Sequence, residues 1–101
     1  MKESIGADLR FLTTAEGGRR TAVASGYCPV ISHPIKPTLS NGCWITWEGP
    51  PRAVPPGGAA RVTLTFLNPK SVGDWVEPGR PFQVREGRRV VAEGIFTDGP
   101  G

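Results

Sequence analysis

Hydrophobic and polar residues alternate along six short segments of the chain, which is the pattern of half-buried β-strands. In the clearest segment, Val62, Leu64 and Phe66 alternate with an arginine and two threonines. The six expected strands cover residues 7–14, 27–35, 43–48, 60–67, 81–85 and 89–97. Because no segment repeats its apolar residues with the period of a helix, the chain is predicted to be all-β.

The alternation also assigns side chains to the core. The residues expected to face inward are Ala7, Leu9, Phe11, Val62, Leu64, Phe66, Phe82, Val84, Val90, Ala92 and Phe96. In the third expected strand, Cys43, Ile45 and Trp47 share one face, and Trp44, Thr46 and Glu48 share the other. Gly94 interrupts the last expected strand, and a glycine there permits a close backbone approach or a bulge. Trp44 and Trp47 fall on opposite faces of one strand. One of them is expected in the core, and the other either outside or beneath the segment 49–58.

Glycine and proline mark the expected turns. The chain has 14 Gly and 11 Pro, and residues 49–58 are so rich in both that no strand is expected there. Pro29 and Pro34 flank the second expected strand, which is predicted to be short, bulged or at an edge, since proline donates no ladder hydrogen bond. Many short strands are typical of a sandwich or barrel, and a closed barrel has no exposed edge strands.

The length of 101 residues is near the commonest domain size. Residues 1–101 are therefore expected to form a single domain, with the barrel at about 7–97 and short flexible ends. No apolar run approaches the roughly 20 residues of a membrane-spanning helix, and no signal core follows the start, so a cytoplasmic location is expected. With a hairpin turn near residues 40–42, Cys28 and Cys43 do not face each other, and both are expected to be free thiols.

Groups suited to catalysis are sparse. His33 is the one histidine, and its neighbour Ser32 points to the opposite face of a strand, so the two do not easily share a hydrogen bond. One histidine and two separated cysteines lack the spacing of a zinc site, and no loop reads as a phosphate-binding P-loop. The sequence predicts no enzyme activity, no catalytic residue, no metal, no cofactor and no GTP binding by this chain.

The charge is mildly basic: 12 Lys plus Arg against 9 Asp plus Glu give a net charge of +3. Most of the cations are arginines, which suit bidentate contacts to carboxylate or phosphate, although coding bias is a plainer source of the same composition. The candidate partner-binding or tRNA-binding residues lie in two loops and are Arg19, Arg20, Arg85, Glu86, Gly87, Arg88 and Arg89. The alternative is that these loops are only tight strand connections, with Gly87 at a positive φ and solvated arginines.

Three stretches in order along the chain carry a resemblance. Residues 8–19 read Asp-Leu-Arg-Phe-Leu-Thr-Thr-Ala-Glu-Gly-Gly-Arg, residues 26–29 read Gly-Tyr-Cys-Pro, and residues 79–94 contain Phe-Gln-Val-Arg-Glu-Gly-Arg-Arg-Val-Val-Ala-Glu-Gly. Together they resemble the third, C-terminal domain of translation elongation factor Tu. That family has Glu-Glu-Gly-Gly-Arg, Gly-Tyr-Arg-Pro and Phe-Ala-Ile-Arg-Glu-Gly-Gly-Arg-Thr-Val-Gly-Ala-Gly in these places. The resemblance covers about residues 7–97 and implies a six-stranded antiparallel β-barrel.

The resemblance also implies partners. In the family this barrel packs on the GTPase domain, meets the exchange factor and touches the T-stem of aminoacyl-tRNA, partly through its Gly-Tyr-Arg-Pro-Gln segment. Here Cys28 replaces that arginine and Val30 replaces the glutamine, which weakens a retained tRNA site because a charge-assisted phosphate donor is lost. Arg88 stands where the family has its second glycine, and it adds charge but removes backbone freedom.

These observations lead to one expected function and two alternatives. The expected function is a non-catalytic, stand-alone β-barrel that acts as a protein-interaction module linked to translation. The first alternative is an RNA-binding module that contacts tRNA through a basic face of arginines. The second is a gene fragment without a selected role.

Overall fold

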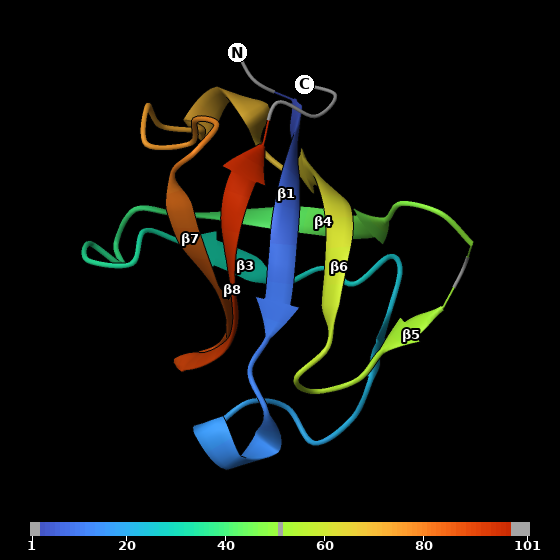
Figure 1. The fold of residues 1–101 in the computed structure, drawn as a ribbon. Coiled ribbons are helices and arrows are strands. Elements are labelled where there is room, and N and C mark those ends of the chain that lie inside the picture. Colours follow the sequence, from blue (N-terminus) through green and yellow to red (C-terminus); the bar gives the residue numbers. More distant parts are fainter. Residues whose placement is uncertain (1–2, 51, 98–101) are drawn as a thin grey trace.

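Six strands close into an antiparallel barrel in the computed structural model, which describes residues 3–50 and 52–97 (Figure 1). They are β1 (Ser4–Phe11), β3 (Val30–Ser32), β4 (Ser40–Trp47), β6 (Ala59–Phe66), β7 (Pro81–Glu86) and β8 (Arg89–Thr97). Around the barrel they follow the order β1-β6-β4-β3-β7-β8, and β8 pairs with β1 to close the ring. The predicted fold class, an all-β protein with a six-stranded antiparallel barrel, is confirmed.

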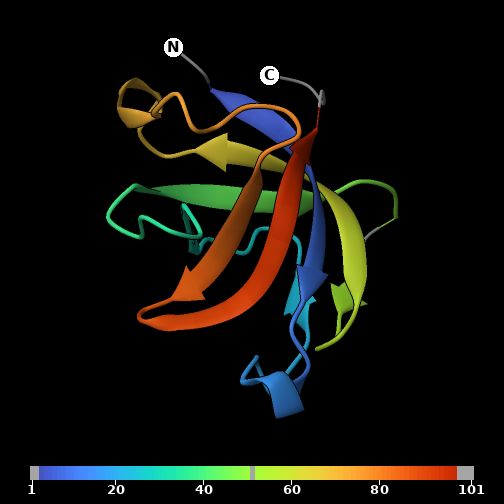
Figure 2. The same cartoon turned by 60° about the vertical axis from the view of Figure 1, so that its left-hand side comes forward.

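Paired side chains from neighbouring strands fill the barrel. Val62 of β6 lies opposite Ala7 of β1, and Leu64 of β6 lies opposite Ile45 of β4; all four are fully buried. Figure 2 shows the β7–β8 hairpin wrapping across the front of this interior. Each fully buried Val, Leu or Ile contributes about 1.5–3 kcal/mol relative to an exposed one, so these layers hold the strands together.

The first strand differs from its prediction at both ends. It begins at Ser4, so the barrel starts before residue 7, and it ends at Phe11 rather than at residue 14. Thr13 and Glu16 form a capping box around the 3-10 turn η1 (Thr14–Glu16), which takes these residues out of the strand. The expected flexible ends lie mostly outside the described residues.

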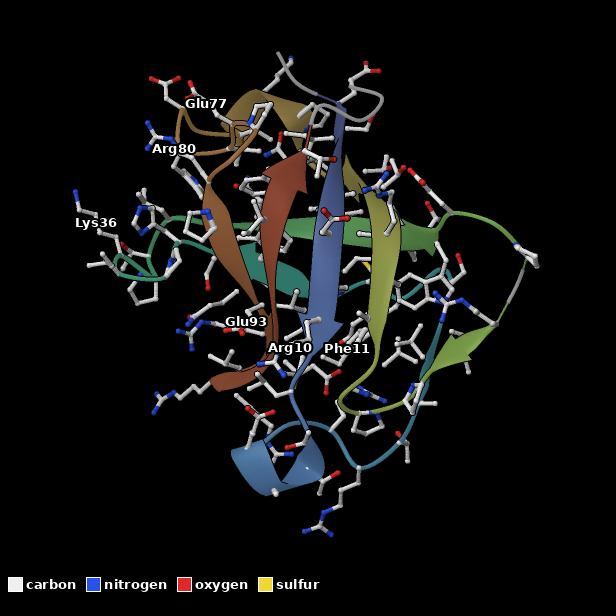
Figure 3. The ribbon with its side chains drawn as sticks, viewed as in Figure 1. Arg10, Phe11, Lys36, Glu77, Arg80 and Glu93 are labelled. Carbon is white, nitrogen blue, oxygen red and sulfur yellow. The ribbon has the colours of Figure 1, made fainter. Side chains whose placement is uncertain are left out.

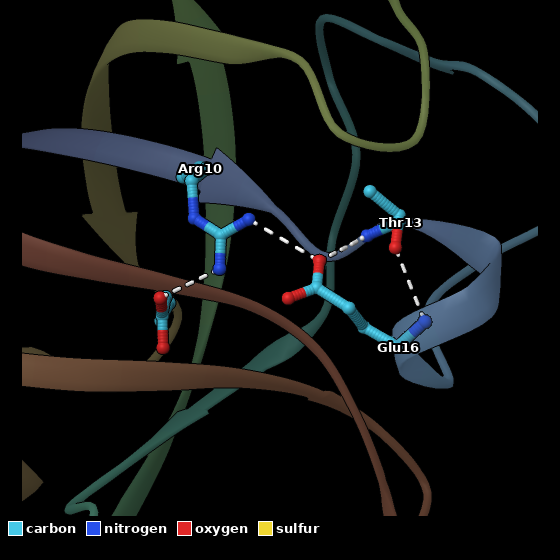
Figure 4. A network of polar contacts seen from close by, with 4 residues as sticks. Arg10, Thr13 and Glu16 are labelled. Atoms are coloured by element: carbon cyan, nitrogen blue, oxygen red, sulfur yellow. Dashed lines mark hydrogen bonds and ion pairs between the residues drawn. The ribbon is translucent and has the colours of Figure 1, made fainter.

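Polar contacts tie η1 to the barrel wall (Figure 4). The Glu16 carboxylate accepts a hydrogen bond from the backbone N–H of Thr13 at 2.8 Å. It also forms an ion pair with Arg10 at 3.3 Å. The pKa of Glu16 is lowered, first by the Thr13 N–H and then by Arg10, because both stabilise its charged form. Arg10 also pairs with Glu93 of β8 at 2.8 Å, so one guanidinium joins β1, β8 and the turn.

The second expected strand is shorter than residues 27–35. Only Val30–Ser32 pair continuously, between Pro29 and Pro34, and Tyr27 adds a single bridge to Ile45. The hairpin to β4 turns at residues 33–39 rather than near 40–42, because the backbone of Leu39 both donates to Lys36 and accepts from His33 there. In this register Cys28 points outward and Cys43 inward, and the expected free thiols are confirmed.

The segment 49–58 does contain a strand, contrary to expectation. It is β5 (Ala53–Val54), which pairs with β2 (Val23–Ala24) as a separate two-stranded sheet. Val54 and Val23 lie opposite each other and both are buried. Burial of this pair outweighs the turn-forming composition around it.

The β6–β7 connection closes one end of the barrel. It contains a second 3-10 turn, η2 (Pro69–Ser71), and then Trp75 and Val76, which are both buried. The Trp75 ring lies 5.7 Å from the ring of Phe96 and 5.7 Å from that of His33. This connection therefore serves as a lid on the core.

A bulge in β8 corrects one core assignment. Val84 pairs with Ala92 but the next residue, Arg85, pairs with Val90, so Val91 is an extra residue in β8. The alternation changes phase at this point. Val91 is therefore fully buried, and Val90, which was expected inside, is half-exposed.

Gly94 of β8 marks a close approach, as expected. A Cβ atom there would lie 2.5 Å from Cζ of Phe82 and 2.7 Å from the carbonyl oxygen of Asp8. The absent side chain gives Phe82 room to stack on Phe96, with ring centroids 4.5 Å apart. The glycine thus allows β1, β7 and β8 to close around two aromatic rings.

We predict that Gly94→Ala destabilises the protein by about 1–3 kcal/mol, because the new methyl group overlaps an aromatic ring and a backbone carbonyl. Gly42→Ala is the matched control on β4. Its Cβ would meet Cδ1 of Leu67 at 3.1 Å, and this exposed side chain can turn away, so the change stays within about 0.5 kcal/mol. Urea unfolding of both variants measures the difference, and equal losses would contradict the packing argument.

Candidate functional site

The structure brings the two predicted arginine loops together at one end of the barrel. An Nη of Arg19 donates to the carboxylate of Glu86, across 67 residues of sequence. The Arg19 guanidinium also lies over the ring of Tyr27, 5.5 Å from its centroid. Figures 1 and 2 both show the η1 loop and the β7–β8 turn at the same end. The two loops therefore meet at one end of the barrel.

Tyr27 completes this cluster, which we call the Arg19–Tyr27–Glu86 cluster. Its hydroxyl donates to the same Glu86 oxygen that Arg19 contacts. Burial raises the pKa of Tyr27, and the neighbouring Glu86 raises it further, so the phenol keeps its proton. Tyr27 was missed as a site residue, although it lies within the Gly-Tyr-Cys-Pro motif. Two of the predicted site residues, Arg19 and Glu86, are thus partners of each other.

Arg85 is also engaged within the molecule. Its Nε donates to the hydroxyl of the buried Ser32 at 2.9 Å. Its two Nη atoms donate to the carbonyl of Arg88 at 3.1 Å and to the side-chain oxygen of Gln83 at 3.2 Å. Arg85 therefore satisfies a buried hydroxyl and fixes the β7–β8 turn, and most of its donors are already used.

Three of the predicted arginines remain open to solvent: Arg20, Arg88 and Arg89 are exposed, and none forms an ion pair within residues 3–50 and 52–97. Gly87 holds the turn between β7 and β8 at a φ of 63°, as expected for a tight connection. The basic end of the barrel consequently offers three free guanidinium groups rather than five.

The two neighbouring tryptophans take opposite roles. Trp47 is 8% exposed, and its Nε1 donates to the carbonyl of Arg52 at 2.7 Å, beneath the segment 49–58. Trp44 is 48% exposed and lies on the outer surface of β4. The Pro-rich segment therefore covers the core tryptophan, and Trp44 belongs to an open surface.

Exposed apolar residues share the outer face of the sheet with Trp44, whose direct partner on β6 is Thr65. We call this surface the tryptophan face and define it by Val30, Gly42, Trp44 and Leu67. Val30 of β3 lies opposite Gly42 of β4, and Leu67, just after β6, reaches over Gly42 from the other side. Val30 is 40% and Leu67 is 54% exposed. Cys28 is exposed on the same outward face, next to Trp44. Leu67 was not predicted as part of a binding surface. Its one signal in the sequence is that an apolar residue stands directly before Asn-Pro, where the strand ends.

His33 and Ser32 are both hydrogen-bonded within the molecule. Nδ1 of His33 accepts the backbone N–H groups of Ile35 and Lys36 at 3.1 Å each, and the Ser32 hydroxyl is bonded to Arg85. No group of three His, Cys, Asp or Glu side chains in these residues has the geometry to hold a metal ion. Nor does this part of the chain contain a helix with the length and apolarity to cross a membrane.

A groove of about 490 Å³ runs along the outside of β1 and β8. Its rim carries Arg10 and Glu93, which lie side by side in Figure 3 and pair at 2.8 Å. Asp8 on the same rim pairs with Arg61 at 3.2 Å. Because these charges neutralise each other, the groove presents no free charged group to a ligand.

No model of a known protein family matches the chain. The likeness to the third domain of elongation factor Tu therefore rests on the three sequence motifs.

Cys43 gives a pH-dependent prediction. Burial, with a smaller effect of Cys28, raises the pKa of the Cys43 thiol from 9.0 to about 12. The unfolded thiol loses its proton first as the pH rises, so stability falls between these two values. We expect Cys43→Val to flatten this alkaline decline in urea-midpoint measurements, while Cys28→Val, which removes only the smaller effect, keeps most of it. Parallel declines in all three proteins would contradict the assignment.

The Arg19–Tyr27–Glu86 cluster gives a prediction for stability. Glu86→Gln is expected to lower the free energy of unfolding by about 1 kcal/mol, because Arg19 and Tyr27 both donate to that carboxylate. Glu77→Gln is the matched control, since the Glu77–Arg80 pair on the β6–β7 connection is longer, at 3.5 Å, and more than half exposed (Figure 3). It should change stability by less than about 0.5 kcal/mol. Guanidinium unfolding compares the two, and an equal effect would exclude the proposed tie between the loops.

Proposed function

We propose that this chain is a non-catalytic protein-interaction module, a β-barrel related to the third domain of elongation factor Tu, that binds a component of the translation machinery. The observation that carries the proposal is the tryptophan face. An exposed tryptophan among exposed aliphatic residues is typical of a protein interface, where such residues contribute most of the binding energy. The link to translation rests on the resemblance.

The residues that differ from the family support a protein partner. Cys28 and Val30 stand where the family's tRNA-contacting segment has an arginine and a glutamine. Both point outward in this barrel, and Val30 is part of the tryptophan face. The polar groups that would contact phosphate are thus replaced by apolar surface at the same position.

The engaged arginines count against the RNA-binding alternative. Arg19 and Arg85 donate to Glu86 and Ser32, which leaves Arg20, Arg88 and Arg89 for phosphate. This alternative still has support, because the shared end of the barrel gathers these three arginines. Binding through about three phosphates would weaken with salt at a logarithmic slope of about −2 to −3, whereas an apolar interface depends little on salt.

The test uses the purified protein as bait in a cytoplasmic extract with and without nuclease, followed by mass spectrometry. We expect translation proteins to be retained after nuclease treatment and lost from Trp44→Ser, with Arg88→Gln/Arg89→Gln retaining them at least in part. Retention of tRNA that needs these arginines and not Trp44 would favour the RNA-binding alternative. Retained proteins unrelated to translation would remove the link to that process.

A further inference from the structure

We propose that the partner docks on the tryptophan face through an acidic segment with an apolar anchor residue. This inference rests on the proposed function and specifies the chemistry of its partner. The anchor would pack on Trp44, and the carboxylates next to it would lie toward the β7–β8 turn. Two features of the surface carry the inference: its apolar centre and the sign of the charge at its border.

The centre of the tryptophan face carries no charged side chain, because it consists of Val30, Gly42, Trp44 and Leu67. Gly42 has no side chain, which lets Leu67 lie over it, and Thr65 of β6 lies directly opposite Trp44. The next outward residue across β3 is Val30. A single exposed indole with exposed aliphatic side chains on the same face suits a leucine or phenylalanine of a protein. A nucleic-acid strand is held by successive aromatic rings, and Trp44 is the one exposed aromatic ring on β3, β4 and β6.

The border on the β7 side is cationic. Val30 lies directly opposite Arg85 of β7, and Arg85 donates to the carbonyl of Arg88, which holds the turn beside it. Strands β3, β4 and β6 contain no Asp or Glu. The acidic residue of β7, Glu86, is occupied by Arg19 and Tyr27. Arg85 itself is bonded to Ser32, Gln83 and the carbonyl of Arg88, so the charged groups left free beside this border are the guanidinium groups of Arg88 and Arg89 in the β7–β8 turn.

The two features select one class of partner. Arginines pair with carboxylates through short, bidentate, charge-assisted hydrogen bonds, and a basic border repels a basic segment, which adds specificity. The apolar centre supplies the burial that surface ion pairs alone do not provide. An acidic segment with one apolar anchor satisfies the centre and the border together.

The test is a selection of random twelve-residue peptides displayed on phage against the immobilised protein. We expect enriched peptides to combine Asp or Glu with a neighbouring Leu, Phe or Trp. Binding of a synthetic copy is then measured by tryptophan emission, which should shift to shorter wavelength as Trp44 is covered. Trp47 and Trp75 are already buried and contribute a constant background.

Three variants locate the site. Trp44→Ser and Leu67→Ser should each weaken the selected peptide by about tenfold or more, with binding of these two variants followed by anisotropy of a labelled peptide. Arg88→Glu should weaken it several-fold and reduce its salt dependence. Lys36→Glu is the matched charge reversal on the β3–β4 turn, where the side chain points away from the barrel (Figure 3), and it should leave binding unchanged. Thermal unfolding confirms that each variant is folded, and Leu67→Ser keeps the test decisive if Trp44→Ser does not fold.

The inference is overturned if no peptide is enriched, if the enriched peptides lack acidic residues, or if both serine variants bind them normally. Preferential binding of a uridine oligonucleotide at Trp44 overturns it as well. These failures are distinct from failure of the proposed function. A translation protein retained from extract by both Trp44→Ser and Arg88→Glu would leave the interaction module standing and show that it docks elsewhere.

Discussion

Closure of the barrel depends on the pairing of β1 with both β6 and β8. That pairing is possible because Gly94 has no side chain where Asp8 and Phe82 approach it. With the ring closed, every barrel strand has two neighbours and the aromatic pair Phe82–Phe96 is sealed inside. The same closure gives the hairpin β7–β8 a fixed position beside β3, so the placement of the arginines and of the tryptophan face follows from it.

The fold was largely readable from local alternation, because strands with one buried face repeat every two residues. Strand β8 was predicted with its observed bounds. The predictions were wrong mainly where a tertiary contact determines the local structure. The bulge at Val91 arises from pairing with β7, and β5 exists because Val54 is buried against Val23. The capping box of Thr13 and Glu16 was present in the sequence as a turn signal, but the first expected strand was extended through it.

The candidate site was readable only in part. Its arginines and Gly87 were identified from two loops, and the turn at Gly87 was anticipated. That Arg19 meets Glu86, or that Arg85 bonds to Ser32, depends on residues more than 50 positions apart, and no local pattern carries such information. These contacts show that some of the charged side chains in the loops stabilise the fold and are not free to bind a partner. The docking surface that we propose is instead on the outer side of β3, β4 and β6, where Val30, Trp44 and Leu67 are exposed on a face expected to be polar.

The η1 loop has a further consequence for recognition. It is fastened at one end by the Glu16 contacts with Thr13 and Arg10, and at the other by Arg19 on Glu86 and Tyr27. Arg20 therefore leaves a backbone that is already ordered before any partner arrives. A ligand that contacts this end would lose little conformational entropy of the protein on association, and its binding would be governed by the rearrangement of a single side chain rather than of a loop.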